Sequence, residues 1–184
     1  MLSRTLTFRH QNIYHFTDNE GKRVRPEFSN AEEGDAAMIE RWNSVVKSQD
    51  HVWHLGDFCM ANGQHWIDIG KRLNGHKRIV PGNHDTCNIE TYKAAGFQKL
   101  QGAKEMQVAG LRLLCSHYPL HVSSLFKRDA NIHGHIHEKE SPSSMIGEDG
   151  KVKSWFNVSV ERIAYTPIHI EEVAKIIKEK ISNV

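Results

Sequence analysis

Metal-ligating side chains stand directly after four short apolar segments of this sequence. Histidine is the commonest metal ligand among the side chains, and the chain holds 13 histidines in 184 residues. The four clusters are Gly56-Asp57 after HVWHL, Gly82-Asn83-His84-Asp85 after RIVP, Ser116-His117 after LRLLC, and Gly134-His135-Ile136-His137 after ANIH. A ligand set of His, Asp and Asn suits Mn, Fe, Zn or Ni. These residues therefore indicate a metal centre.

The order of the clusters is more informative than any one of them. A Gly-Asp pair after a strand is usually a turn, and Asn83-His84-Asp85 alone could also form one. The run from His133 to His137 is more specific, because three imidazoles within five residues rarely serve packing. We expect His133 to face away from His135, as a histidine of the sheet.

The apolar segments before the clusters have the length of buried strands. Ligands in layered α/β proteins collect at the carboxyl ends of strands, and glycine lets the backbone turn sharply there. A capping box at Ser29-Asn30-Ala31-Glu32 opens the first expected helix. We expect helices over residues 29–46, 64–73, 90–95 and 171–181, and strands over 51–55, 78–80, 105–108, 111–115, 131–133, 155–160 and 166–170. Helices alternate with strands early and strands follow in series late, which predicts a layered α/β sandwich with a mixed sheet.

The composition suits a single domain over residues 1–184. The chain has 24 Lys and Arg against 22 Asp and Glu, and this near-balance gives no strong signature of duplex nucleic-acid binding. Three separate cysteines without a CxxC pair are typical of a reducing cytosol. The sequence has no apolar run of about 18 residues for a membrane helix and no secretory signal. We therefore expect a cytoplasmic protein without a membrane partner; nothing in the sequence indicates an oligomeric state.

Taken in order, GD, GNHD, a strand-end His and GHxH resemble the pattern of the calcineurin-like metallophosphoesterase family. The resemblance spans about residues 9–165, and further matches to small bacterial and phage members are HQNI, RP, RWN, WHLGDF, LNG and HYPL. It implies a layered α/β/β/α sandwich with mixed sheets. It also implies hydrolysis of phosphate mono- or diesters by metal-activated water.

The resemblance implies two divalent ions, such as Mn²⁺, Fe, Zn²⁺ or Ni²⁺. Asp57 would bridge both ions through its carboxylate, which suits two cations about 3.5–4 Å apart. Asn83, His117 and His135 would complete one metal site, and His137 would belong to the other. The neutral Asn83 would add a ligand without adding negative charge.

Catalytic roles are implied for His84 and Asp85. His84 would contact the phosphate and stabilise or protonate the leaving oxygen, with Asp85 orienting its ring. Asn83 and His84 would also bind substrate, together with His10, for which a structural role is an equal alternative.

The implied substrate is a phosphate-ester small molecule or a nucleotide. No cap domain is evident, so we expect a shallow site. Four basic residues are candidates for steering a small anion: Arg23, Arg25, Lys127 and Arg128.

The sequence departs from the family pattern at its start. The family opens with a strand ending in Asp-x-His, which supplies the rest of the first metal site, and here Thr5 and Thr7 stand at those positions. A threonine hydroxyl is a poor replacement for a carboxylate or an imidazole. Only Asp57 and His137 remain for that site, so we expect one bound ion and reduced activity. The alternatives are a degenerate metal- or phosphate-binding module without catalysis, and a metal-binding scaffold for a protein partner.

The genetic code offers one origin for this departure. Residues 3–8 can be encoded so that a shifted reading frame yields Ser-Asp-Thr-His-Phe, and loss of one base at Phe8 restores the frame at Arg9. We therefore hypothesise that residues 1–8 are a frame-shifted or atypical start.

Overall fold

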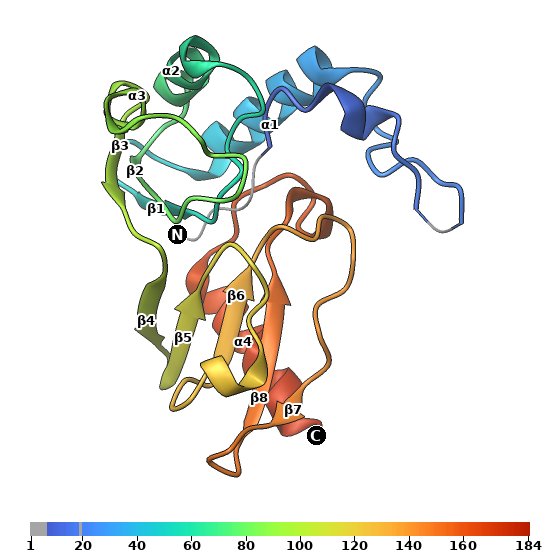
Figure 1. Ribbon diagram of the computed structural model, residues 1–184, viewed down its shortest axis with the longest axis vertical. Coiled ribbons are helices and arrows are strands. Elements are labelled where there is room, and N and C mark those ends of the chain that lie inside the picture. The colour runs from blue at the N-terminus through green and yellow to red at the C-terminus, as the bar shows by residue number, and fades with distance from the viewer. Residues whose placement is uncertain (1–6, 19) are drawn as a thin grey trace.

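The computed structural model describes residues 7–18 and 20–184 and places them in two sheets with flanking helices (Figure 1). Its elements are η1 (Gln11–Tyr14), α1 (Ala31–Val45), β1 (His51–His54), α2 (Gly63–Arg72), β2 (His76–Ile79), α3 (Ile89–Ala94), β3 (Phe97–Leu100), β4 (Lys104–Val108), β5 (Leu111–Cys115), η2 (Val122–Ser124), β6 (Ala130–His133), β7 (Met145–Ile146), β8 (Val152–Asn157), η3 (Val160–Arg162) and α4 (Ile170–Ser182), where η marks a 3₁₀-helix. The expected mixed α/β fold is confirmed.

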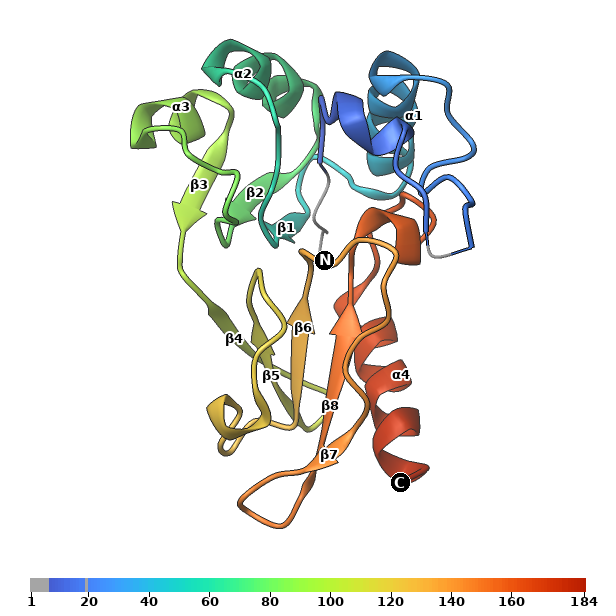
Figure 2. The same ribbon diagram turned by 45° about the vertical axis from the view of Figure 1, so that its right-hand side comes forward.

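The two sheets direct their strand ends toward one another. The first sheet has the order β1-β2-β3 and is parallel. The second has the order β4-β5-β6-β8-β7, in which β5, β6 and β8 run parallel and the edge strands β4 and β7 run antiparallel. The arrowheads of β6 and β8 point toward the first sheet, and those of the first sheet point toward the second (Figure 2). The loops that follow these strands therefore meet between the two sheets.

The alternation of side chains along β1 explains how the first sheet joins two cores. Val52 belongs to the cluster shared with α1–α3, which includes Trp42 and Trp66. Trp53, one residue on, belongs to the cluster that contains Ile132 of the second sheet and residues of α4. Both clusters are buried, and they hold the loop after β1 between them.

The start of α1 differs slightly from the expected capping box. Asn30, not Ser29, is the N-cap, and its side chain accepts a hydrogen bond from the backbone N–H of Glu33 at 2.9 Å. The Glu33 carboxylate reaches back to the N–H of Ser29 at 2.8 Å. The N-cap therefore lies one residue further along the chain than expected, and Glu33 bonds to the N–H before the N-cap, whereas in a capping box it would bond to the N–H of the N-cap itself.

The expected strand at 166–170 is absent from the structure. Residues 163–166 form turns and a bend, and α4 begins at Ile170. Pro167 has no N–H to donate to a sheet. The side chain of His169 instead caps α4 by accepting from the N–H of Glu171.

A buried carboxylate in α1 makes the stability of this fold depend on pH. Burial raises the pKa of Asp35 to about 6, although the Arg9 backbone N–H donates to it at 3.1 Å. A carboxyl group with a raised pKa stabilises the fold when protonated, so stability is lost as the pH rises through about 6. We expect Asp35→Asn to raise the free energy of unfolding at pH 7.5 by about 1–2 kcal/mol and to have little effect near pH 4, measured by urea titration.

Glu32→Gln is the matched control for this prediction. Glu32 pairs with the same Arg9 at 2.8 Å, but its side chain is 63% exposed, so we expect a change below about 0.5 kcal/mol. A destabilised Asp35→Asn protein at both pH values would contradict the prediction.

Candidate metal centre

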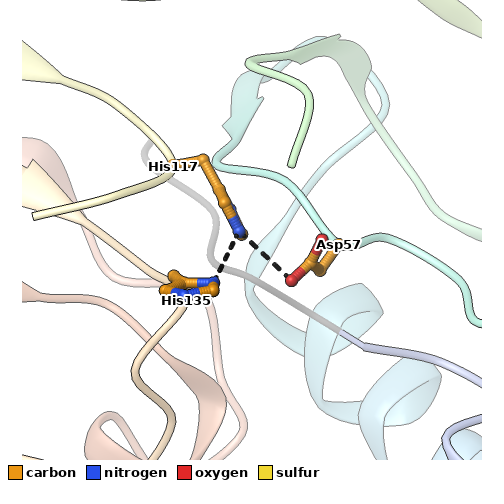
Figure 3. A group of neighbouring side chains, drawn as sticks. All are labelled: Asp57, His117 and His135. Carbon is orange, nitrogen blue, oxygen red and sulfur yellow. Dashed lines mark hydrogen bonds and ion pairs between the residues drawn. The ribbon is translucent and has the colours of Figure 1, made fainter. Parts of the chain in front are cut away.

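Four loops at the carboxyl ends of strands bring the expected ligands together. Asp57 follows β1, Asn83 follows β2, His117 follows β5, and His135 follows β6. The side chains of Asp57, His117 and His135 point toward one another, with His117 in contact with both others (Figure 3). These three ligands therefore converge from both sheets on one point.

The distances within this group are those of a potential metal site. His117 Nε2 lies 3.2 Å from Asp57 Oδ2, 3.0 Å from Asn83 Oδ1 and 3.2 Å from His135 Nδ1. One ligand atom from each of Asp57, His117 and His135 lies within 4.8 Å of the other two. A set of one carboxylate, one amide oxygen and two imidazoles fits a divalent transition-metal ion.

The ring of His117 is held with the correct nitrogen facing the centre. Its Nδ1 donates to the carbonyl oxygen of Leu55 at 2.8 Å, which leaves the lone pair of Nε2 directed at the other ligands. Burial alone would raise the pKa of Asp57, but its contact with His117 outweighs that effect and lowers it. Burial likewise opposes charge on His117, yet the pKa of His117 is raised by Asp57. Metal binding at His117 therefore competes with its protonation.

The backbone at three of these residues has positive φ angles, which are unusual for residues other than glycine. Asp57, His135 and His137 have φ values of 53°, 67° and 50°, in the left-handed region that non-glycine residues rarely adopt. Such conformations cost energy and are found most often at functional sites. The loops are thus shaped to aim these side chains.

Two glycines allow the loops to approach this closely. A Cβ on Gly82 would lie 2.3 Å from Asp57 Oδ1, and a Cβ on Gly56 would lie 2.5 Å from His117 Nδ1. Any side chain at either position would displace a candidate ligand.

Asp85 holds two of the loops together. Its carboxylate accepts from the backbone N–H groups of Asp57 at 2.7 Å, Phe58 at 2.8 Å and Gly82 at 2.8 Å. This use of the side chain was not foreseen from the sequence, and the expected orientation of the His84 ring by Asp85 stays a prediction.

His84 lies beside the candidate metal centre. Its backbone N–H donates to Asp57 Oδ1 at 2.9 Å, and the residue is exposed. The exposed imidazole is therefore accessible to a ligand from solvent. Its catalytic role stays a prediction.

The second expected metal site lacks a matching set of ligands. Thr7 is brought next to the loop after Asp57, because Phe8 N–H donates to Phe58 O at 2.9 Å. Thr7 Oγ1 and Glu161 Oε2 are buried, and neither has a hydrogen-bond partner among the described residues. Thr5 lies outside the described residues. Asp57 and His137, without a further carboxylate or imidazole from this segment, do not fit a second ion.

His137 contacts a buried ion pair. Glu161 Oε1 lies 3.4 Å from His137 Nδ1 and accepts from Arg25 Nε at 3.0 Å. Arg25 and Glu161 have side chains only 1% and 3% exposed. Arg25 therefore cannot steer an anion at the surface, which corrects that expectation. No local sequence pattern predicts the pairing of Arg25 with Glu161, because the two residues lie 136 positions apart.

His10 has a structural contact and also lies near His137. It caps η1, where Ile13 N–H donates to its Nδ1 at 3.1 Å. Its ring also lies 6.0 Å from that of His137, so it reaches the rim of the centre. Burial, with the nearby His137, lowers the pKa of His10 to about 4. The ring is therefore neutral at pH 7, and because Nδ1 accepts, its proton lies on Nε2.

His133 is a structural histidine of the sheet. It is the last residue of β6, and the backbone turns at His135, whose φ is 67°. His133 is fully buried, and its ring nitrogens contact Gly134 O at 2.9 Å and Ser141 Oγ at 3.2 Å. Burial lowers its pKa to about 4. It therefore takes no part in the candidate centre.

Fold and site together define the class: a two-sheet α/β protein with metal-ligating residues at the carboxyl ends of its strands. A family model described as the calcineurin-like phosphoesterase superfamily domain matches residues 34–154. The chain belongs to this superfamily, as the motif order indicates. The metal centre described above lies within the matched residues.

Relatives of the chain occur in archaea, phages and bacteria. An uncharacterized protein of Methanocaldococcus jannaschii is 29% identical over 174 residues, which cover 94% of this chain and 87% of that protein. The gene 66 protein of Mycobacterium phage L5 is 31% identical over 143 residues, covering 62% of this chain and 69% of that protein. The crystal structure of a protein of unknown function from Aquifex aeolicus matches with a TM-score of 0.71 and 26% identity, over 95% of this chain and 97% of that one.

The family to which the chain belongs is one of phosphoesterases, so its reaction class is hydrolysis of phosphate esters. Within residues 7–18 and 20–184, no helix is both long enough and apolar enough to span a membrane.

Proposed function

We propose that the protein is a metal-dependent phosphoesterase that hydrolyses phosphate mono- or diesters. The observation that carries this proposal is the four-ligand group of Asp57, Asn83, His117 and His135, with the exposed His84 directly beside it. Family membership supports the same reaction class. The substrate is a phosphate-ester small molecule or a nucleotide, and the domain extends over residues 1–184.

The four ligands would hold one divalent ion, with Mn²⁺, Fe, Zn²⁺ and Ni²⁺ as the candidates. Such an ion polarises phosphate oxygens and lowers the pKa of water when bound. Asp57 supplies the negative charge among these ligands, and Asp85 fixes the backbone that carries Asp57. His117 is kept in its ligating orientation by Leu55.

Proton transfer to the leaving group is assigned to His84. The His84 side chain extends from the loop that also carries Asn83, and the His84 backbone N–H donates to Asp57. An imidazole beside the phosphate can donate a proton to the departing alkoxide oxygen. His10 Nε2–H, at the rim, is a neutral donor for a phosphate oxygen.

The second candidate function is a phosphate- or metal-binding module without catalysis. Thr7 favours this alternative, because it stands where the family pattern has a ligating histidine. The exposed His84 favours the enzyme, because a binding module has no use for a proton donor.

Hydrolysis of bis(4-nitrophenyl) phosphate and 4-nitrophenyl phosphate with added Mn²⁺ separates the two candidates. We expect His84→Ala to lower kcat about 100-fold while Mn²⁺ affinity is unchanged, because the residue transfers a proton and does not ligate the ion. His65→Ala removes a half-buried histidine on α2, outside the candidate centre; it is the control and should keep wild-type kcat. Equal kcat values for wild type and His84→Ala would refute the catalytic role.

A further inference from the structure

A pocket adjoins the candidate metal centre on the side of the N-terminal segment. It has a volume of about 370 Å³, and both His135 and His137 form part of its wall. The opposite wall is apolar and consists of Ile13, Phe16 and Val24. A ligand in this pocket would therefore touch the metal-ligating loop after β6 at one end and an apolar surface at the other.

Phe16 is unusual among the apolar residues of this pocket in its exposure to solvent. Its side chain is 49% exposed, although it is large and apolar. Its backbone carbonyl accepts from the N–H of Val24 at 2.9 Å, and a bridge joins Thr17 to Arg23. The chain thus folds back on itself to present Phe16 and Val24 together. Phe16 is not an isolated exposed side chain but part of the apolar wall with Ile13 and Val24, and contiguous apolar surface rimmed by polar residues is typical of ligand-binding grooves.

Aromatic rings connect this wall to the metal centre. The His10 ring stands edge to face with the Phe16 ring at 5.7 Å and with the His137 ring at 6.0 Å. These ring contacts link Phe16, in the pocket wall, to His137, in the loop that also carries His135. Aromatic surfaces of this kind bind other planar rings by stacking and edge-to-face contact.

The size of the pocket limits what it can hold. Ligand pockets in proteins measure about 300–1,000 Å³, so 370 Å³ suits a group of one or two rings. Its lining also includes one acidic and one basic side chain, Glu138 and Lys139, whose formal charges cancel. An uncharged planar group matches this lining better than a second phosphate.

We propose that this pocket binds the aromatic group of the phosphate ester, a nucleobase or an aryl ring, while the phosphate lies at the metal centre. The proposal rests on the proposed phosphoesterase function, because it takes the metal centre as the place of the phosphate. It makes Phe16 a specificity-determining residue, which contacts the organic part of the substrate and takes no part in bond cleavage.

Phosphonates test the pocket without requiring hydrolysis. We expect Mn²⁺-loaded wild-type protein to bind phenylphosphonate at least about 10-fold more tightly than methylphosphonate, measured by calorimetric titration. Phe16→Ala should reduce this preference to less than about 3-fold with little change in the Kd of methylphosphonate. Phe16→Leu keeps an apolar contact and should give an intermediate preference. Phe126→Ala, an equally drastic change at a residue 65% exposed and outside the pocket, should leave the preference intact.

A nucleotide pair distinguishes the two sources of the aromatic group. If the pocket holds a nucleobase, wild-type protein should bind adenosine 5′-monophosphate more tightly than ribose 5-phosphate, and Phe16→Ala should remove the difference. A preference seen with phenylphosphonate alone assigns the pocket to aryl esters.

The outcomes for the pocket and for the proposed function are separable. The pocket assignment would be overturned if wild type and Phe16→Ala showed the same preference for the aromatic ligand. It would also be overturned if wild type showed no such preference or bound neither ligand. Absence of hydrolysis of aryl phosphates would refute the proposed function but would leave the phosphonate preference measurable.

Discussion

Replacing Asp57 with asparagine is expected to lower kcat/KM for aryl phosphates at least about 1,000-fold and to weaken Mn²⁺ binding strongly. Asp57 is the single anionic side chain in the group with Asn83, His117 and His135. Asparagine has nearly the same shape, and its Oδ1 can still accept the His84 N–H, which donates to Asp57 Oδ1 at 2.9 Å. The fold should therefore persist while the charge that attracts the cation is lost. The measurements are Mn²⁺ titration and steady-state kinetics on the same preparation.

Asp68→Asn provides the matched control for Asp57→Asn. Asp68 lies on α2 and bonds to Gln64 at 2.7 Å in an exposed position, so the same loss of charge there should change neither Kd for Mn²⁺ nor kcat/KM. Unchanged hydrolysis in Asp57→Asn would mean that the centre around His117 is not the place of the reaction.

The position of the candidate site could be predicted because it depends on strand ends. Asp57 and His117 lie 60 positions apart, yet each follows a short apolar strand. Parallel strands of one sheet end at the same edge, so a residue just after one strand lies near the residues that follow its neighbours. The apolar segments before Asp57 and His117 were recognisable because buried strands need continuous apolar residues. Asp57 and His117 follow strands of different sheets, so their meeting also depends on how the two sheets face one another, which strand order alone does not give.

Other features could not be predicted because no local pattern encodes them. β3 has only four residues, FQKL, of which Phe97 is buried and the next two are exposed, so its apolar signal is too short to detect. The pairing of Arg25 with Glu161 joins distant segments, and each residue alone resembles a surface charge. The resemblance implies that Asp85 orients the ring of His84; that its buried carboxylate also accepts backbone N–H groups from two loops has no local signal. Contacts of these kinds depend on tertiary packing.

The double replacement Thr5→Asp with Thr7→His is expected to raise the Mn²⁺ content from one to two ions per chain. We also expect kcat/KM to rise at least about 100-fold, because a second cation would stabilise the leaving oxygen as well as the attacking one. Thr7 is 1% exposed and lies beside the loop that carries Asp57, so an imidazole at this position is directed into the protein and not into solvent. Metal analysis after equilibrium dialysis and steady-state kinetics measure the two effects.

Thr7→Gln separates coordination from packing in this experiment. Glutamine also fills this buried position, where Thr7 Oγ1 has no hydrogen-bond partner among the described residues, but it supplies no imidazole. If better packing alone raised activity, Thr7→Gln would reproduce the gain; if coordination is responsible, it leaves one ion per chain. Two ions already bound to the wild-type protein, or one ion retained by the double variant, would contradict the prediction. A gain in both quantities would favour the hypothesis that residues 1–8 are a frame-shifted start, because the rest of the chain would then have kept a place for the Asp-x-His ligands that this start lacks.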